Sequence, residues 1–265
     1  MPCRMESKEK SSAMSRKMIL VGGMPRSGTT LLSRLIGERF RIPFSPETHY
    51  FSLAYTQGEL VLENLPREAI EERRVEDAYR KIINQPRSVR TFRILLSEIL
   101  NDSPIVGEKT PAHLTAFSEI LATDSNVTCL VIVRDFFEVI ESLRKVDWNN
   151  ASFLANLKRC IRYHQITYHT QRRFPDRLIV VDYRTLCENE QRVIAALLKR
   201  LPQGSNSEAQ QIFDPELEPW KKNALSAPEV ICREVPLKRM HQWLIAKFSR
   251  LACSIIWPIT TAHNN

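Results

Sequence analysis

Residues 23–30, Gly-Met-Pro-Arg-Ser-Gly-Thr-Thr, have the residue types and spacing of an anion-binding loop. The Gly-x-x-x-x-Gly spacing matches the phosphate-binding P-loop, in which backbone amides point at the ligand. A nucleotidase places a lysine after the second glycine, but here that residue is Thr29, and the cation is Arg26 within the loop. The loop therefore favours a short anion held by amides, hydroxyls and one guanidinium. It argues against nucleoside triphosphate hydrolysis, in which lysine and metal act together.

A second anion-binding pair is predicted further along the chain. Arg134 follows the apolar run 127–133, and Ser142 lies eight residues later. If a helix begins at Asp135, Ser142 lies two turns into it, near the preceding loop. A guanidinium binds an anion through a fork of N–H groups, and a hydroxyl adds a further bond. The alternative is a salt bridge from Arg134 to Asp135 or to a neighbouring helix.

These side chains need a scaffold that brings strand ends and helix starts to one edge. Apolar runs predict strands, and apolar positions with helical spacing predict helices between them. The alternation predicts an α/β fold like that of P-loop nucleoside kinases, a doubly wound parallel sheet with helices on both faces and ligand at the strand carboxyl ends. The predicted strands are 18–21, 104–107, 127–133 and 178–181, the predicted helices are 31–39, 66–83, 89–100, 112–122, 136–145, 151–174 and 186–201, and residues 44–50 and 203–219 are a polar island and a loop.

Residues 25–31, Pro-Arg-Ser-Gly-Thr-Thr-Leu, resemble the 5′-phosphosulfate loop of sulfotransferases that use 3′-phosphoadenosine 5′-phosphosulfate (PAPS). The preceding residues 21–23, Val-Gly-Gly, are most similar to the tyrosylprotein sulfotransferases. The resemblance spans about residues 18–222, with its specific motifs in short islands. It implies that the 5′-phosphosulfate is held by Arg26, Ser27, Gly28, Thr29 and Thr30.

The resemblance also implies catalytic residues. The Glu-Thr pair beginning at Glu47 is similar to the pair whose Glu is the base in tyrosylprotein sulfotransferases, and a base helps because the acceptor hydroxyl has a high pKa. His49 is the rival base, since small-molecule sulfotransferases use a His. The Lys-Thr-Pro beginning at Lys109 resembles the family's Lys-x-Pro, whose lysine stabilises the charge developing on the leaving phosphate oxygen. The implied catalytic set is Glu47, Lys109 and Arg26.

The remaining islands resemble the nucleotide site. Arg134 and Ser142 look like the family's 3′-phosphate site, and Tyr183 corresponds to a tyrosine that lies against the nucleotide, although a core tyrosine fits the sequence nearly as well. Lys221 and Lys222 follow a tryptophan and resemble the late segment that closes over the adenosine and the 3′-phosphate; the sequence does not choose between them. No metal is expected, because no carboxylate pair or metal-ligand spacing accompanies the loop.

Composition predicts one basic domain. The 265 residues are 43% apolar, enough for a sizeable core, and the charged, apolar-poor segment 1–17 is expected to be disordered before a single sulfotransferase domain over 18–265. The net charge of +8 suits an anionic nucleotide or an acidic acceptor, and general solubility explains it equally well. Nucleic acid is not expected as a partner, because zinc-finger spacing and aromatic-basic patterning are missing.

Two features predict a cytoplasmic, bacterial-type enzyme. The six cysteines are scattered without a Cys-x-x-Cys, which favours reduced thiols. No signal peptide or spanning segment opens the chain, unlike the membrane-anchored tyrosylprotein enzymes of the Golgi. The apolar segment 243–259 carries Lys247 and Arg250 and no acid; packing on its own domain or on a second subunit is favoured over attachment to an anionic membrane.

The sequence thus predicts transfer of a sulfuryl group from PAPS to a hydroxyl, with a tyrosine in an acidic peptide or protein as the preferred acceptor. A carbohydrate or small-molecule sulfotransferase would share every cofactor motif. A P-loop kinase would need the missing lysine at Thr29 and a carboxylate for Mg²⁺. A non-catalytic nucleotide-binding module would leave Glu47 and Lys109 without a role.

Overall fold

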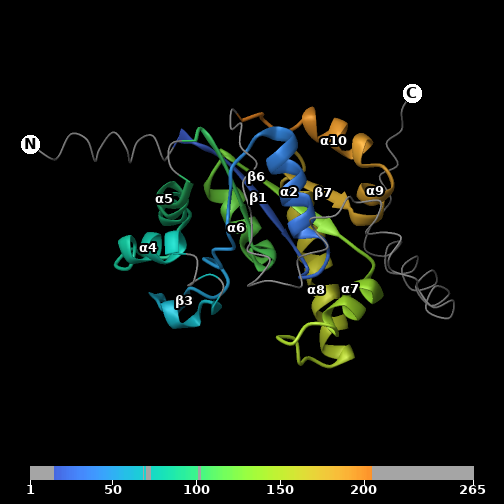
Figure 1. Ribbon diagram of the computed structural model, residues 1–265, viewed down its shortest axis with the longest axis horizontal. Helices are drawn as coiled ribbons and strands as arrows, with labels where there is room; N and C mark the ends of the chain where they lie inside the picture. Colours follow the sequence, from blue (N-terminus) through green and yellow to red (C-terminus); the bar gives the residue numbers. More distant parts are fainter. Residues whose placement is uncertain (1–14, 68, 70–72, 101–102, 205–265) are drawn as a thin grey trace, which may run out of the picture.

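The computed structural model describes residues 15–67, 69, 73–100 and 103–204 of the chain (Figure 1). The predictions for residues 1–14, for Lys221 and Lys222 and for the segment 243–259 lie outside these ranges. Lys17 starts the first strand, and the buried Arg16 accepts a 2.6 Å hydrogen bond on its carbonyl oxygen from Arg93 Nη1.

A parallel sheet forms the centre of the described domain. Its strands follow the order β2-β5-β1-β6-β7, and every neighbouring pair runs parallel. The strand bounds are β1 (Lys17–Gly23), β2 (Phe44–Ser45), β5 (Ile105–Lys109), β6 (Val127–Val133) and β7 (Leu178–Asp182). The sequence of β6, Val-Thr-Cys-Leu-Val-Ile-Val, is β-branched and largely buried, as expected for a central strand covered on both faces.

Helices cover both faces of this sheet. Ile19 and Val21 of β1 belong to a core cluster with α2, α9 and α10, whereas Met18 and Leu20 point into a second cluster with α4, α5 and α6. Figure 1 shows α4 and α5 toward one end of the sheet and α9 and α10 toward the other. The helices are α2 (Thr29–Phe40), α4 (Arg73–Lys81), α5 (Val89–Leu100), α6 (Phe117–Thr123), α7 (Phe136–Leu143), α8 (Phe153–Arg173), α9 (Tyr183–Glu188) and α10 (Glu190–Leu198), with 3₁₀ turns η1 (Leu62–Asn64) and η2 (Pro111–Ala116). The predicted doubly wound α/β fold is confirmed.

Several predicted elements differ in detail. The helix expected over 186–201 is two helices, because Asn189 caps a new one by accepting a hydrogen bond from the Arg192 amide. Tyr183, two residues after the predicted strand 178–181, begins α9. The helix expected over 112–122 starts as the 3₁₀ turn η2, and α4 lies within the helix expected over 66–83.

Two short features were not predicted. The first two residues of the polar island 44–50 form the edge strand β2 beside β5. Beyond it, β3 (Tyr55–Thr56) and β4 (Glu59–Leu60) form an antiparallel hairpin whose turn residues Gln57 and Gly58 have φ values of 52° and 90°. In the ranges that the structure describes, none of the helices is long and apolar enough to cross a membrane.

Candidate active site

The loop between β1 and α2 has the backbone of a tight anion-binding turn. Arg26 and Gly28 both have positive φ, 71° and 105°. A side chain at Gly28 has no room, because a Cβ there would lie 2.6 Å from the Tyr183 ring. This position needs glycine on both counts, which explains the second glycine of the predicted loop.

Two polar groups of this loop are suited to receive an anion. Gly28 is the N-cap of α2 and supplies no side chain to cap its first amides, whereas α7, α8, α9 and α10 each begin with a capping Asp, Ser or Asn. The buried Ser27 hydroxyl makes no hydrogen bond within the described part of the chain. A buried hydroxyl beside uncapped helix amides is suited to an anion such as the phosphosulfate expected at this loop, because that group would supply acceptors for each of them.

The structure brings the loop and the second predicted anion-binding pair together. Arg26 Nε donates a 3.0 Å hydrogen bond to Ser142 Oγ on α7, and Arg134 Nη1 donates one of 3.3 Å to the Arg26 carbonyl. The Arg134 guanidinium also lies 4.2 Å from the centre of the Tyr183 ring. Four residues predicted from three islands therefore form one cluster, built from the loop after β1, the end of β6, the last turn of α7 and the start of α9.

The charge of this cluster favours an anionic ligand. Burial lowers the pKa of Arg26, and the positive charge of Arg134 lowers it further, against a smaller opposing effect of Tyr183. Arg134 also forms a 2.8 Å salt bridge with Glu138 on α7, so the alternative considered from the sequence, a salt bridge to a neighbouring helix, is realised. A bound anion would relieve the repulsion between the two guanidinium groups, and the stacked Tyr183 ring fixes the plane of one of them.

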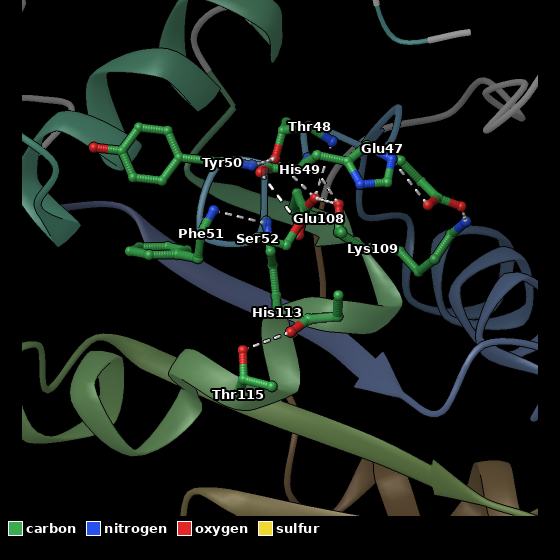
Figure 2. Close-up of polar contacts among 12 residues, drawn as sticks. Glu47, Thr48, His49, Tyr50, Phe51, Ser52, Glu108, Lys109, His113 and Thr115 are labelled. Carbon is green, nitrogen blue, oxygen red and sulfur yellow. Dashed lines mark hydrogen bonds and ion pairs between the residues drawn. The ribbon is translucent and has the colours of Figure 1, made fainter. Parts of the chain in front are cut away.

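The proposed base and the proposed leaving-group lysine are in contact. Lys109 Nζ at the end of β5 hydrogen-bonds to Glu47 Oε1 (Figure 2). The Lys109 side chain is 1% exposed and that of Glu47 is 15% exposed, so the carboxylate reaches the surface while the lysine does not. His49 Nε2 lies 3.5 Å from the other Glu47 oxygen, which means that both candidate bases of the sequence analysis share one site.

Sheet register explains this meeting. Lys109 pairs with Val21 of β1, close to the start of the anion-binding loop. Ser45 of β2 pairs with Glu108 on the other side of β5, so the chain after β2 runs past the end of β5. Glu47 lies two residues beyond Ser45 and therefore reaches Lys109, the residue after Glu108.

A buried carboxylate beside this pair was missed by the sequence analysis. Glu108 is fully buried and accepts hydrogen bonds from the Thr48 amide and hydroxyl, from the Thr110 hydroxyl and from His113 Nδ1. Burial raises the pKa of Glu108, but the interaction with His113 and the other hydrogen bonds outweigh it and hold the pKa below its usual value. The available signal was a Glu next to a Lys at the end of an otherwise apolar strand.

A small pocket lies behind the loop, between η2, β6, α7 and α8. Its partly buried His164 donates from Nδ1 to the Cys160 carbonyl at 3.1 Å, and desolvation lowers the pKa of His164 to about 4, so the imidazole is neutral near pH 7. The lining residues include Met24, Ser27, Leu114, Arg134, Tyr163 and His164. No metal-binding group of three or more His, Cys, Asp or Glu occurs among the residues described.

Comparisons with known proteins agree with this architecture. The sequence model of the sulfotransferase family matches residues 18–202. The sulfotransferase domain of an olefin synthase from Synechococcus PCC 7002 is 18% identical, with a TM-score of 0.53 over 88% of this chain and 94% of that one. A sulfotransferase from Alicyclobacillus acidocaldarius is 13% identical, with a TM-score of 0.51 over 91% of this chain and 94% of that one. No curated protein sequence matches the chain.

The two solved structures are similar in fold, which at these identities is all that they establish. The family match is more informative, because it includes the anion-binding loop, Glu47, Lys109, Arg134, Ser142 and Tyr183 and ends just before residue 203. Enzymes of this family take their sulfuryl group from PAPS. Since the family model matches well over half of its sequence, the chain belongs to the sulfotransferase family.

Proposed function

We propose that this sulfotransferase transfers the sulfuryl group of PAPS to the hydroxyl of a tyrosine in an acidic peptide or protein. The observation that supports it most is the contact between Glu47 and Lys109 at the end of β5. It sets a carboxylate that can accept a proton next to a buried cation that can stabilise a leaving oxygen. PAPS, when bound, supplies an activated sulfuryl group attached to a phosphate.

In this proposal each part of the cluster has one task. Arg26, Ser27 and the first amides of α2 hold the phosphosulfate end, and Arg134 with Ser142 holds the 3′-phosphate. Glu47 takes the acceptor proton as the new O–S bond forms, and Lys109 stabilises the phosphate oxygen as the old S–O bond breaks. The Tyr183 ring packs beside the nucleotide. Lys221 or Lys222 remains a proposed contact to the adenosine and 3′-phosphate end of the nucleotide.

Two features support a tyrosine in an acidic peptide as the acceptor: the positive net charge of the chain and the carboxylate of Glu47. The chain carries a net charge of +8, which attracts an acidic peptide by long-range steering. A phenol has a pKa near 10 and is mostly protonated at neutral pH, so it gains from a carboxylate at hydrogen-bonding distance. The second candidate is a small-molecule or carbohydrate acceptor, and one observation favours it: His49, the type of base that small-molecule sulfotransferases use, lies 3.5 Å from Glu47.

The test is an acceptor panel. The protein is incubated with PAPS and with tyrosine peptides in acidic and neutral contexts, simple phenols and sugars, and the products are weighed by mass spectrometry. Acidic tyrosine peptides should gain one sulfuryl group fastest. Sulfation of sugars or simple phenols but not of the acidic peptides would refute the acceptor, and no transfer to any acceptor would refute the activity.

Matched variants identify the base. Glu47→Gln keeps the shape of the side chain but cannot take the proton, so turnover should fall by roughly 10²–10⁴-fold while nucleotide affinity is nearly unchanged. His49→Ala should cost much less. An active Glu47→Gln together with an inactive His49→Ala would assign the base to His49 and favour a small-molecule type of mechanism.

A further inference from the structure

The segment that carries Glu47 is held by side chains from the segment that carries Lys109. The Thr48 amide donates to Glu108 Oε1 at 3.3 Å, and the His49 amide donates to Thr110 Oγ1 at 3.2 Å. Two residues on, the Phe51 amide donates to His113 Nε2 at 3.1 Å. These backbone groups lie outside any regular helix or strand, so side chains take the place of sheet hydrogen bonds (Figure 2).

The protonation states of this network are fixed by its geometry. A backbone amide only donates, so His113 Nε2 must accept from Phe51 and carries no proton. The ring proton is then on Nδ1, 3.0 Å from Glu108 Oε2, which accepts it. The other oxygen of Glu108 accepts hydrogen bonds from the Thr48 and Thr110 hydroxyls. Because both of its oxygens act as acceptors, Glu108 is an ionised carboxylate beside a neutral histidine.

This network also determines the direction of Glu47. Thr48 and Glu47 are adjacent and project in different directions, as do Glu108 and Lys109 across from them. One pair of contacts, Thr48 to Glu108, anchors the segment from within the core; the other, Glu47 to Lys109, forms the proposed transfer site. The Tyr79 hydroxyl adds a 2.6 Å bond to the Thr48 carbonyl.

The segment needs this support because its backbone is strained. His49 has a φ of 54°, an unusual conformation for a residue with a side chain. Its carbonyl oxygen is the acceptor for the amides of Ser52, Leu53 and Ala54, so the chain turns sharply at this residue. Such a turn persists only where surrounding contacts hold it.

We propose that Glu108 and His113 are positioning residues of the transfer site: buried and without a role in binding the donor, they hold the turn at residues 47–51 so that Glu47 points at Lys109. This inference rests on the proposed function insofar as it assigns Glu47 as the base. The geometry of the turn, however, can be measured independently of activity.

Glu108→Gln is the discriminating variant. Glutamine retains the volume and one oxygen for Thr48 and Thr110, but its amide group then faces the Nδ1 proton of His113. If the histidine moves its proton to Nε2, the proton faces the Phe51 amide instead. Either way two donors oppose each other and one link of the network is lost.

Three measurements are made on the full chain. For transfer to the best acceptor of the panel, kcat of Glu108→Gln should fall roughly ten- to hundredfold, because small misplacements of a reacting group cost that much. Affinity for the product nucleotide 3′-phosphoadenosine 5′-phosphate should stay within about threefold by calorimetry. Hydrogen exchange at the Thr48 and Phe51 amides should accelerate more than exchange within α5.

Two controls separate positioning from general destabilisation. Asp124→Asn disturbs the ion pair between Asp124 and the buried Arg93 of α5, and should keep kcat and slow exchange at Thr48 and Phe51. Thr48→Ser keeps the hydroxyl bond to Glu108 and should retain kcat, whereas Thr48→Val loses the bond and should lose activity.

The outcomes are distinguishable. Wild-type kcat and slow exchange in Glu108→Gln would overturn the positioning inference while leaving the proposed function intact. Equal losses of kcat in Glu108→Gln and Asp124→Asn would also overturn it, by assigning a purely structural role. If the wild type transfers nothing, the proposed function fails, and the exchange data alone decide whether Glu108 and His113 hold the turn.

Discussion

Replacement of Gly28 by alanine tests the tight approach of the loop to Tyr183. Gly28 has a φ of 105°, and a Cβ there would lie 2.6 Å and 2.9 Å from two carbons of the Tyr183 ring and 3.2 Å from Ile132 Cδ1. The ring cannot swing away freely, because the Arg134 guanidinium lies over it. The variant therefore combines an unfavourable backbone conformation with a steric conflict.

The expected cost has two parts. A left-handed conformation costs a residue with a Cβ roughly 1–2 kcal/mol. Overpacking in a rigid site adds about 1–3 kcal/mol, so Gly28→Ala should lower the free energy of unfolding by about 2–5 kcal/mol in total. For a domain of this size, each kcal/mol lowers Tm by about 2–4 °C.

Gly58→Ala is the matched control. Gly58 has a comparable φ of 90°, but nothing lies within 4 Å of a Cβ placed there. It should carry only the backbone part of the cost, roughly 1–2 kcal/mol. Urea denaturation of both variants gives the difference, which isolates the contact with Tyr183.

A double variant completes the test. Tyr183→Ala removes the ring, so Gly28→Ala should cost less in that background than in the wild type. Equal costs for Gly28→Ala and Gly58→Ala, or full additivity with Tyr183→Ala, would refute the argument that the loop is built against this ring.

Three further predictions follow from the charged groups. Arg26→Ala should weaken nucleotide binding tenfold or more by calorimetry, because a charge-assisted hydrogen bond contributes roughly 1.5–3 kcal/mol; unchanged affinity in a folded variant would remove the loop from the site. Arg134→Ala or Ser142→Ala should reduce the preference for the 3′-phosphorylated nucleotide over its 3′-hydroxyl analogue, and an undiminished preference in both would sink that assignment. Burial raises the pKa of Asp124, but the hydrogen bonds from Arg93 and the Asn126 amide and the nearby arginine charges outweigh burial, so the pKa is lowered overall. The ionised Asp124 therefore stabilises the fold above its unfolded pKa of about 3.8, and this stabilisation is lost as the pH falls through the folded pKa. Asp124→Asn should therefore be less stable at pH 7 and should lose less stability than the wild type on acidification; parallel pH profiles would contradict this.

The parts of the fold predicted well are those with local signals. β6 and α5 match the predicted bounds, because a continuous apolar run and a clear helical period each identify a long buried element. The anion-binding loop was predicted because its glycines permit the backbone of a tight turn, as the φ of 105° at Gly28 shows. Tertiary contacts were not needed for any of these.

The parts that were missed depend on partners distant in sequence. β2 has only two residues, so it has no periodicity to detect, and it is a strand only because β5 lies beside it. The boundary between α9 and α10 is set by the capping side chain of Asn189, while the apolar spacing continues across it. Glu108 received no role from the sequence, because two of its four hydrogen bonds come from Thr48, 60 residues earlier, and the others from Thr110 and His113 depend on how the chain turns after β5.

The strand register between β2 and β5 also brings together the two residues of the proposed transfer site. Phe44 pairs with Gly107, and a Cβ at Gly107 would lie 2.5 Å from the Phe44 ring, so the edge strand packs directly on the backbone of β5. A slip of one residue would separate Phe44 from this gap and would present the opposite set of side chains to each face. Glu47 would then meet Glu108 and not Lys109, a contact between two carboxylates. The glycine at the centre of β5 thus selects the pairing in which the proposed base faces the proposed leaving-group cation, which ties the chemistry of the site to the packing of an edge strand.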